Sequence, residues 1–137
     1  MSRFIDPIPD DKQPSESENV VYDTVYRAMY NRDANDINNF LPTYIERHYK
    51  PESFFSREQT TFSLSVFTNE TDLISALRVN AKKWNKVEAL AVGHTDLNKG
   101  ISTKEDNGHV NYYLFDYKGN NPCVDFRYLK DIDKKNE

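Results

Sequence analysis

Hydrophobic and polar residues alternate with a period of two along three stretches of the chain, which is the pattern of a half-buried β-strand. These stretches are 60–67, 109–117 and 124–128. A fourth stretch, 87–92, is short and almost wholly apolar, as a central strand would be, and Gly93 follows it. The chain therefore predicts four strands, three of them in its last fifty residues.

Helical spacing of apolar residues is found in the remaining parts of the chain. Residues 19–31 follow the i, i+3, i+4, i+7 rule and predict an amphipathic helix. Residues 70–84 predict a second helix, for which Asn69 is a good N-cap. The segment 34–48 keeps helical spacing around Pro42, which interrupts the hydrogen-bond ladder, so two short helical pieces are expected there.

This order of elements, helices first and then strand, helix and three strands, indicates an α+β fold. We expect N-terminal helices packed on a small mixed, mostly antiparallel sheet with a C-terminal β-hairpin. The hairpin joins the last two strands through the turn signal at 119–122. A helical crossover links 60–67 to 87–92, so these strands are expected to run parallel with a right-handed connection.

The two ends of the chain lack apolar periodicity. Residues 1–18 contain three prolines among acidic and serine residues and predict a disordered acidic tail. Residues 19–130 are expected to form a single domain, a size that suits one hydrophobic core. Residues 131–137 are charged and predicted to be frayed.

Charge and cysteine content narrow the class of protein. The net charge of −4 is uneven, because residues 1–70 hold 12 acids and 7 bases whereas the rest holds 10 acids and 11 bases. Lys and Arg cluster only near the end of the predicted 70–84 helix, where the helix dipole favours cations, so we do not expect nucleic-acid binding. A single cysteine excludes an internal disulfide, and no apolar run approaches a membrane span. We expect a cytoplasmic protein.

Candidate metal ligands gather around the predicted C-terminal strands. His94 and Asp96 lie two residues apart on one face of an extended segment, and His109 begins the next strand. Two imidazoles and a carboxylate suit zinc, and Asp116 or Asp125 is placed to join them. The spacing matches no known zinc signature, and the alternative is that Asp96 and its neighbours are turn residues.

The 93–108 connection is long enough to serve as a binding loop or a lid. It carries Lys99 and Lys104, which offer positive charge to an anionic ligand. Other candidate binding residues flank it on the predicted hairpin, namely Tyr112, Asp116 and Asp125. The alternative is a polar excursion without function.

One further combination lies outside this region. Arg27, the Ser63–Ser65 pair of a predicted strand and a later glutamate suggest, by loose analogy, nicotinamide-ribosyl chemistry. The alternative is that the serines mark the polar face of an amphipathic strand. Cys123 lacks any neighbour that would activate it and is expected to be a small buried hydrophobe.

Two functions of different classes follow from these patterns. The first is a small cytoplasmic protein-interaction module, of the inhibitor or accessory-subunit type, without catalytic activity or cofactor; its many tyrosines suit a protein interface. The alternative is a metal-dependent hydrolase that acts on a phosphate ester or another anionic substrate through a divalent metal such as zinc. The sequence leaves the oligomeric state and the identity of the protein partner open.

Overall fold

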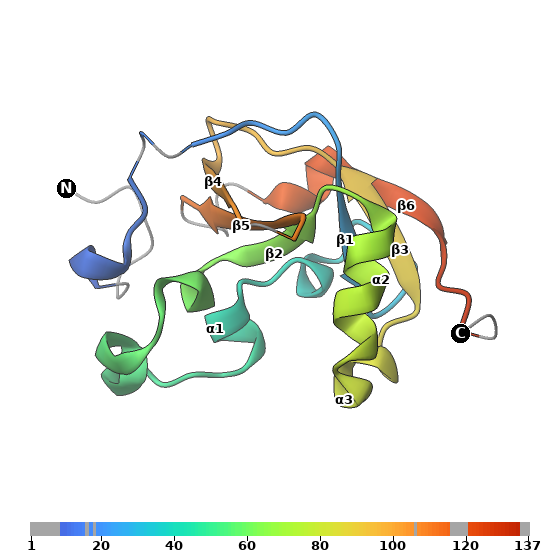
Figure 1. The fold of residues 1–137 in the computed structure, drawn as a ribbon, viewed down its shortest axis with the longest axis horizontal. Coiled ribbons are helices and arrows are strands. Elements are labelled where there is room, and N and C mark those ends of the chain that lie inside the picture. Colours follow the sequence, from blue (N-terminus) through green and yellow to red (C-terminus); the bar gives the residue numbers. More distant parts are fainter. Residues whose placement is uncertain (1–8, 16, 18, 106, 116–120, 135–137) are drawn as a thin grey trace.

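A single six-stranded antiparallel sheet forms the centre of the protein in the computed structural model, which describes residues 9–15, 17, 19–105, 107–115 and 121–134 (Figure 1). The strand order across the sheet is β4-β5-β2-β1-β3-β6. The strands are β1 (Val25–Met29), β2 (Leu64–Phe67), β3 (Ala89–Gly93), β4 (Gly100–Lys104), β5 (His109–Leu114) and β6 (Phe126–Asp131).

The predicted N-terminal helix over 19–31 is wrong, because this segment contains β1, an internal strand of the sheet. Its apolar residues satisfy both periodicities, but its valine and tyrosine content favours a strand. β1 pairs along its whole length with β3 and so supplies the hydrogen bonds that a buried β3 needs. The fold is therefore dominated by its sheet, rather than built from N-terminal helices packed on a small sheet.

The predicted C-terminal hairpin and the mixed sheet are also wrong. β5 pairs with β2 and β4, whereas β6 pairs with β3 at the opposite edge of the sheet. All five strand pairings within the described ranges are antiparallel. β2 and β3 do run in the same direction, but β1 lies between them. The hairpin that forms is β4–β5, and its first strand, β4, lies inside the connection expected to be a loop.

The helix predicted over 70–84 is present as two short helices, α2 (Glu70–Arg78) and α3 (Ala81–Trp84). Asn69 caps α2 by accepting a hydrogen bond from the Asp72 amide, as expected. Asn80 caps α3 in the same way and so explains the interruption. The segment around Pro42 forms a short 3-10 turn and a short helix with Pro42 at its N-cap. These and the other short elements are α1 (Thr43–Glu46), η1 (Asp10–Lys12), η3 (Ile37–Asn39), η4 (Pro51–Ser56), η5 (Gln59–Phe62) and η6 (Pro122–Asp125).

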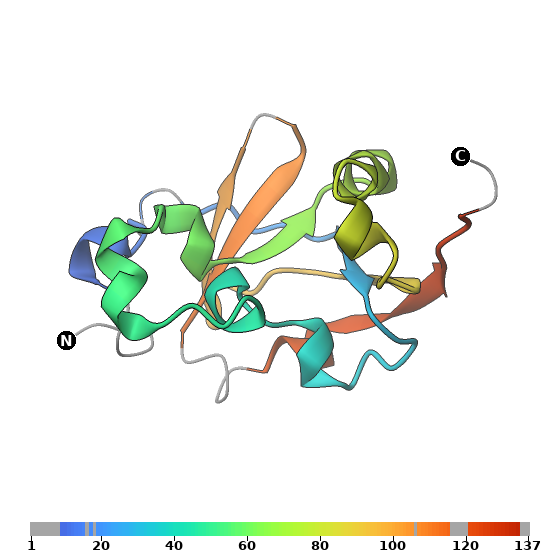
Figure 2. The same ribbon diagram turned by 90° about the horizontal axis from the view of Figure 1, so that it is seen from below.

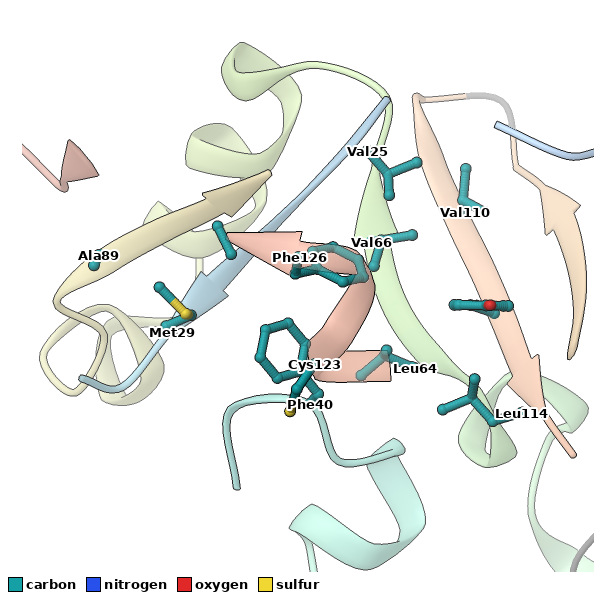
Figure 3. Close-up of a cluster of buried hydrophobic side chains, with 12 residues drawn as sticks. Val25, Met29, Phe40, Leu64, Val66, Ala89, Val110, Leu114, Cys123 and Phe126 are labelled. Carbon is teal, nitrogen blue, oxygen red and sulfur yellow. The ribbon is translucent and has the colours of Figure 1, made fainter. Parts of the chain in front are cut away.

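The sheet buries an apolar layer on each of its faces. On one face, Met29, Val66 and Leu114 pack with Phe40, whose ring lies 5.0 Å from that of Phe126 (Figure 3). On the other face, Leu73 and Leu77 of α2 pack on Ala28, Phe67 and Leu90. Figure 2 shows α2 and α3 on one side of the sheet and the η3 turn on the other. Of the predicted tails, residues 1–8, 16, 18 and 135–137 lie outside the described residues.

Candidate functional site: a cleft beside α2 and α3

A basic hollow of about 450 Å³ opens between the end of α1 and the α2–α3 region. Four of its lining side chains are cationic and only one, Glu46, is acidic. Tyr30 and Asn80 complete the lining. The cationic residues are Arg47, Lys82, Lys83 and Lys86. We call this space the basic hollow.

A second space of about 290 Å³ lies between α2 and the face of β1 and β2. Most of its lining surface is apolar, although seven of its twelve lining residues are polar or charged, and we call it the apolar hollow. The apolar lining residues are Ala28, Phe67, Leu73, Ala76 and Leu77, and the polar ones include Arg27, Ser65, Asn107 and His109. The two hollows share Arg47, Asn80 and Lys83 as lining residues and therefore lie next to each other, and we call the two together the cleft.

Arg27 lies where β1 and β2 separate at the edge of the cleft. The two strands pair only at Tyr26 and Phe67, so the carbonyl of Ser65 lacks a strand partner on that side. Arg27 as a whole residue is 4% exposed. Its guanidinium donates to this carbonyl over 2.8 Å and to the Asn39 carbonyl over 2.6 Å. Burial lowers the Arg27 pKa, and the nearby Glu46 carboxylate opposes this effect. Arg27 thus holds the separated strands in place.

Glu46 is the anionic centre of the basic hollow. Its carboxylate accepts a hydrogen bond from Arg27 over 3.4 Å and lies 3.5 Å from the ammonium of Lys83. Burial, with a further contribution from Glu46, raises the pKa of Tyr30 to about 12. Burial also lowers the pKa of Lys83. Because the single carboxylate is already shared by two cations, the remaining positive charge of the basic hollow faces solvent.

Ser65, His109 and Glu105 form a chain of hydrogen bonds at the apolar hollow. The His109 Nε2 atom lies 2.9 Å from Ser65 Oγ, and its Nδ1 atom lies 2.8 Å from Glu105 Oε2. The side-chain amide of Asn111 donates to Glu105 Oε1 over 3.1 Å. The hydrogen bond from His109 is the main cause that lowers the Glu105 pKa, with a smaller contribution from Asn111.

Ser63 and Ser65, the pair of serines in the predicted strand, have different surroundings in the structure. Ser63 is fully buried, and its hydroxyl lies 2.8 Å from the Thr60 carbonyl and 3.1 Å from the Asn111 side chain. Ser65 is only partly buried and lines the cleft. Of the Arg27, Ser63 and Ser65 combination, the structure therefore brings Arg27 and Ser65 to the cleft.

The predicted metal ligands are not brought together. His109 aligns across the sheet with Phe67, Tyr26 and Val92, which places β2 and β1 between His109 and the end of β3, a separation of roughly 14 Å. His94 follows β3 and approaches Asp125 instead, with 3.4 Å between Nε2 and Oδ1. No group of three metal-ligating side chains occurs in the described part of the chain.

The other predicted binding residues have structural partners. The Lys99 ammonium donates to the Asp125 carboxylate over 2.5 Å. The Tyr112 hydroxyl is buried, accepts from the Asp96 amide over 3.0 Å, and has a pKa raised by burial. Lys104 is exposed at the end of β4.

Asp116, a candidate in both predicted sites, lies outside the described residues. The 93–108 segment is not a loop throughout, because residues 100–104 form β4.

The sequence alone did not identify Glu105, Glu46 or Arg47 as residues of the site, nor the contact between Lys83 and Glu46. Asn107–Gly108 is a typical hairpin signal, but a two-residue turn at these positions pairs residue 106 with residue 109 and does not predict Glu105 beside His109. In the structure the Glu105 amide instead donates to the His109 carbonyl over 2.8 Å, and Gly108 has a positive φ of 78°. No comparable local pattern identifies Glu46 or Arg47.

Comparison with known proteins adds no relative to this picture: no family model, no curated protein and no solved structure matches the chain. Among the helices that the structure describes, none has the length and apolar character needed to cross a membrane.

Proposed function

We propose that the protein binds a phosphate-bearing nucleotide in the cleft, with the phosphates in the basic hollow and the planar base in the apolar hollow. This proposal is carried by the adjacency of two hollows of opposite character, which share Arg47, Asn80 and Lys83 as lining residues. A nucleotide likewise joins charged phosphate groups to a planar base. Ligand pockets of a few hundred Å³ are commonly apolar with a few placed polar groups.

The charges of the basic hollow favour an anion. Arg47, Lys82 and Lys86 have no counter-charge in the hollow other than Glu46, which contacts Arg27 and Lys83. Phosphate oxygens accept charge-assisted hydrogen bonds from Arg and Lys, and these bonds are about twice as strong as neutral ones. A ligand phosphate would therefore neutralise the positive charge of the basic hollow, which Glu46 neutralises only in part.

The apolar hollow offers surfaces that suit a ring. The rings of Phe67 and His109 lie 5.0 Å apart on its sheet side, and Leu73 and Leu77 face them from α2. A planar base that lies against the hollow-facing surface of these side chains removes apolar area from water and contacts an aromatic ring.

A second candidate function concerns the chemistry performed on such a ligand. Arg27 and Ser65 lie on neighbouring strands, and Glu105 approaches Ser65 through His109. This juxtaposition supports the nicotinamide-ribosyl analogy, whose alternative is an ordinary polar strand face. A carboxylate near a glycosidic bond stabilises the oxocarbenium-like transition state of its cleavage. Incubation with nicotinamide dinucleotide and detection of free nicotinamide tests this candidate, and no release above a Glu105→Gln control contradicts it.

Isothermal titration calorimetry tests the binding proposal. The ligands are AMP, ADP, nicotinamide adenine dinucleotide and adenosine, which has no phosphate. We expect saturable binding of the phosphate-bearing compounds and at least about tenfold weaker binding of adenosine, because charged hydrogen bonds contribute most of the difference. The double variant Lys82→Ala/Lys86→Ala should weaken nucleotide binding by about the same factor. The matched control Lys50→Ala/Lys104→Ala removes equal charge from exposed lysines outside the cleft.

Equal effects of the two double variants would show a diffuse charge effect and would overturn the cleft as the binding site. Binding of adenosine as tightly as AMP would overturn the phosphate assignment.

A protein partner stays a prediction. Three of the large exposed apolar side chains lie on different elements, with Phe55 on η4, Val124 on η6 and Tyr128 on β6. Capture of a partner that competes with nucleotide would link the interaction-module hypothesis to the cleft.

A further inference from the structure

The Ser65–His109–Glu105 chain has a defined direction of proton donation. Hydrogen bonds from His109 and Asn111 favour the ionised form of Glu105, and an ionised carboxylate only accepts hydrogen bonds. The Nδ1 atom of a neutral His109 therefore carries the proton. Its Nε2 atom, 2.9 Å from Ser65 Oγ, is left with a lone pair that accepts the hydroxyl proton.

We propose that Ser65 is a nucleophile activated by His109, with Glu105 orienting the imidazole, and that its substrate is a carboxylic ester of a phosphate-bearing alcohol. The assignment of the nucleophile rests on geometry: nucleophile, base and orienting carboxylate lie in sequence within hydrogen-bond reach, an arrangement that recurs on unrelated folds. The phosphate-bearing class of the alcohol rests on the proposed function of the cleft.

The reaction proceeds in two halves. In the first, Ser65 Oγ forms a bond to the ester carbonyl carbon while its proton passes to His109 Nε2. The carbon–oxygen bond to the alcohol then breaks, and the alcohol oxygen takes that proton. In the second, a water oxygen attacks the acyl carbon, its proton passes to Nε2, and the Ser65–carbon bond breaks to regenerate the hydroxyl.

Side chains of the apolar hollow are placed to assist this step. Asn107 and Lys83 line the same space as Ser65 and carry hydrogen-bond donors for the negative charge that develops on the carbonyl oxygen. Leu73 and Leu77 exclude water from one side of the hollow.

Covalent labelling with diisopropyl fluorophosphate tests the nucleophile without knowledge of the substrate. Ser65 Oγ bonds to phosphorus, the phosphorus–fluorine bond breaks, fluoride leaves and the proton passes to His109. Intact-mass spectrometry should show one adduct, located at Ser65 by peptide mapping and absent from Ser65→Ala. Labelling should slow by about a hundredfold in His109→Ala and at least about tenfold in Glu105→Gln.

Ser63→Ala is the matched control, because Ser63 lies two residues away on the same segment but bonds to Thr60 and Asn111 rather than to an imidazole. It should label at the rate of the unmodified protein. His109→Gln provides a second variant if His109→Ala has an altered thermal midpoint. No adduct on the folded protein, an adduct at another residue, or labelling unchanged in both His109 variants would overturn the nucleophile.

Protection by nucleotide separates this inference from the proposed function. Labelling that AMP slows supports both. Labelling that AMP leaves unchanged supports the nucleophile and contradicts the nucleotide class, whereas AMP binding without labelling supports the nucleotide class and overturns the nucleophile.

Discussion

The guanidinium of Arg27 on β1 donates a hydrogen bond over 2.8 Å to the backbone carbonyl of Ser65 on β2, the neighbouring strand. A side chain here takes the place of a backbone partner, because β1 and β2 pair only at Tyr26 and Phe67 before they separate. The separation opens the sheet beside the cleft, and Arg27 keeps the polar groups at the opening satisfied. The same contact therefore supports the fold and shapes the candidate site.

Replacing Arg27 should destabilise the protein strongly. Arg27→Leu leaves the carbonyls of Ser65 and Asn39 without their donor and Glu46 without its buried partner, and we expect a loss of about 3 kcal/mol. Urea denaturation followed by circular dichroism measures the change in the free energy of unfolding. The control is Arg32→Leu, which removes an arginine paired with Asp131 on the surface and should change little. Equal losses in the two variants would contradict the structural role of Arg27.

Gly108 is required by the turn that places Glu105 beside His109. Its φ of 78° disfavours any residue with a Cβ atom, and a Cβ at this position would also meet the Asp72 carboxylate. Gly108→Ala should cost about 1–2 kcal/mol of stability from the backbone alone. It should also slow fluorophosphate labelling, because the β4–β5 turn is displaced. Thermal denaturation and labelling rates of the variant check both effects, and an unchanged thermal midpoint would contradict the left-handed turn.

The stability contribution of Glu105 should depend on pH with a defined sign. Hydrogen bonds from His109 and Asn111 lower the Glu105 pKa in the folded protein. Such a group stabilises the fold above its unfolded pKa of about 4.3, and this contribution is lost as the pH falls through the lower folded value. The thermal midpoint of Glu105→Gln should therefore lie below that of the unmodified protein at pH 7.

The difference between the two midpoints should shrink as the pH falls below about 4.3. Because the Glu105 side chain is 44% exposed, solvent screening keeps the effect small. A difference that grows as the pH falls below about 4.3 would contradict the lowered pKa.

The local chemistry of several elements was predictable because its causes lie within a few residues. The start of α2 follows from the capping residue Asn69, and the start of α1 follows from Pro42. The strand β2 follows from the alternation of apolar and polar residues around Val66. Asn107–Gly108 carries a turn signal of the same local kind, and the hairpin that it forms joins Glu105 to His109.

Pairing across the sheet was decided only by the tertiary structure. Residues 25–29 keep the spacing of an amphipathic helix, yet the strand forms because β2 and β3 need a partner between them. The same long-range pairing separates β5 from β6, so the expected hairpin does not form and His94 is kept away from His109. Periodicity records which face of an element is buried, but it does not record which element covers that face.

In the candidate site, too, some features follow from the sequence and others only from the tertiary structure. By itself, the sequence determined the residue types available for chemistry, including Arg27, Ser65 and His109, and the solvent-facing lysines at the end of α3. Only the tertiary structure decided that these residues share one cleft, because their strands and helices come from distant parts of the chain and are neighbours through sheet order and core packing. Glu46 acquires its role in the same way, from a buried arginine 19 positions earlier in the chain.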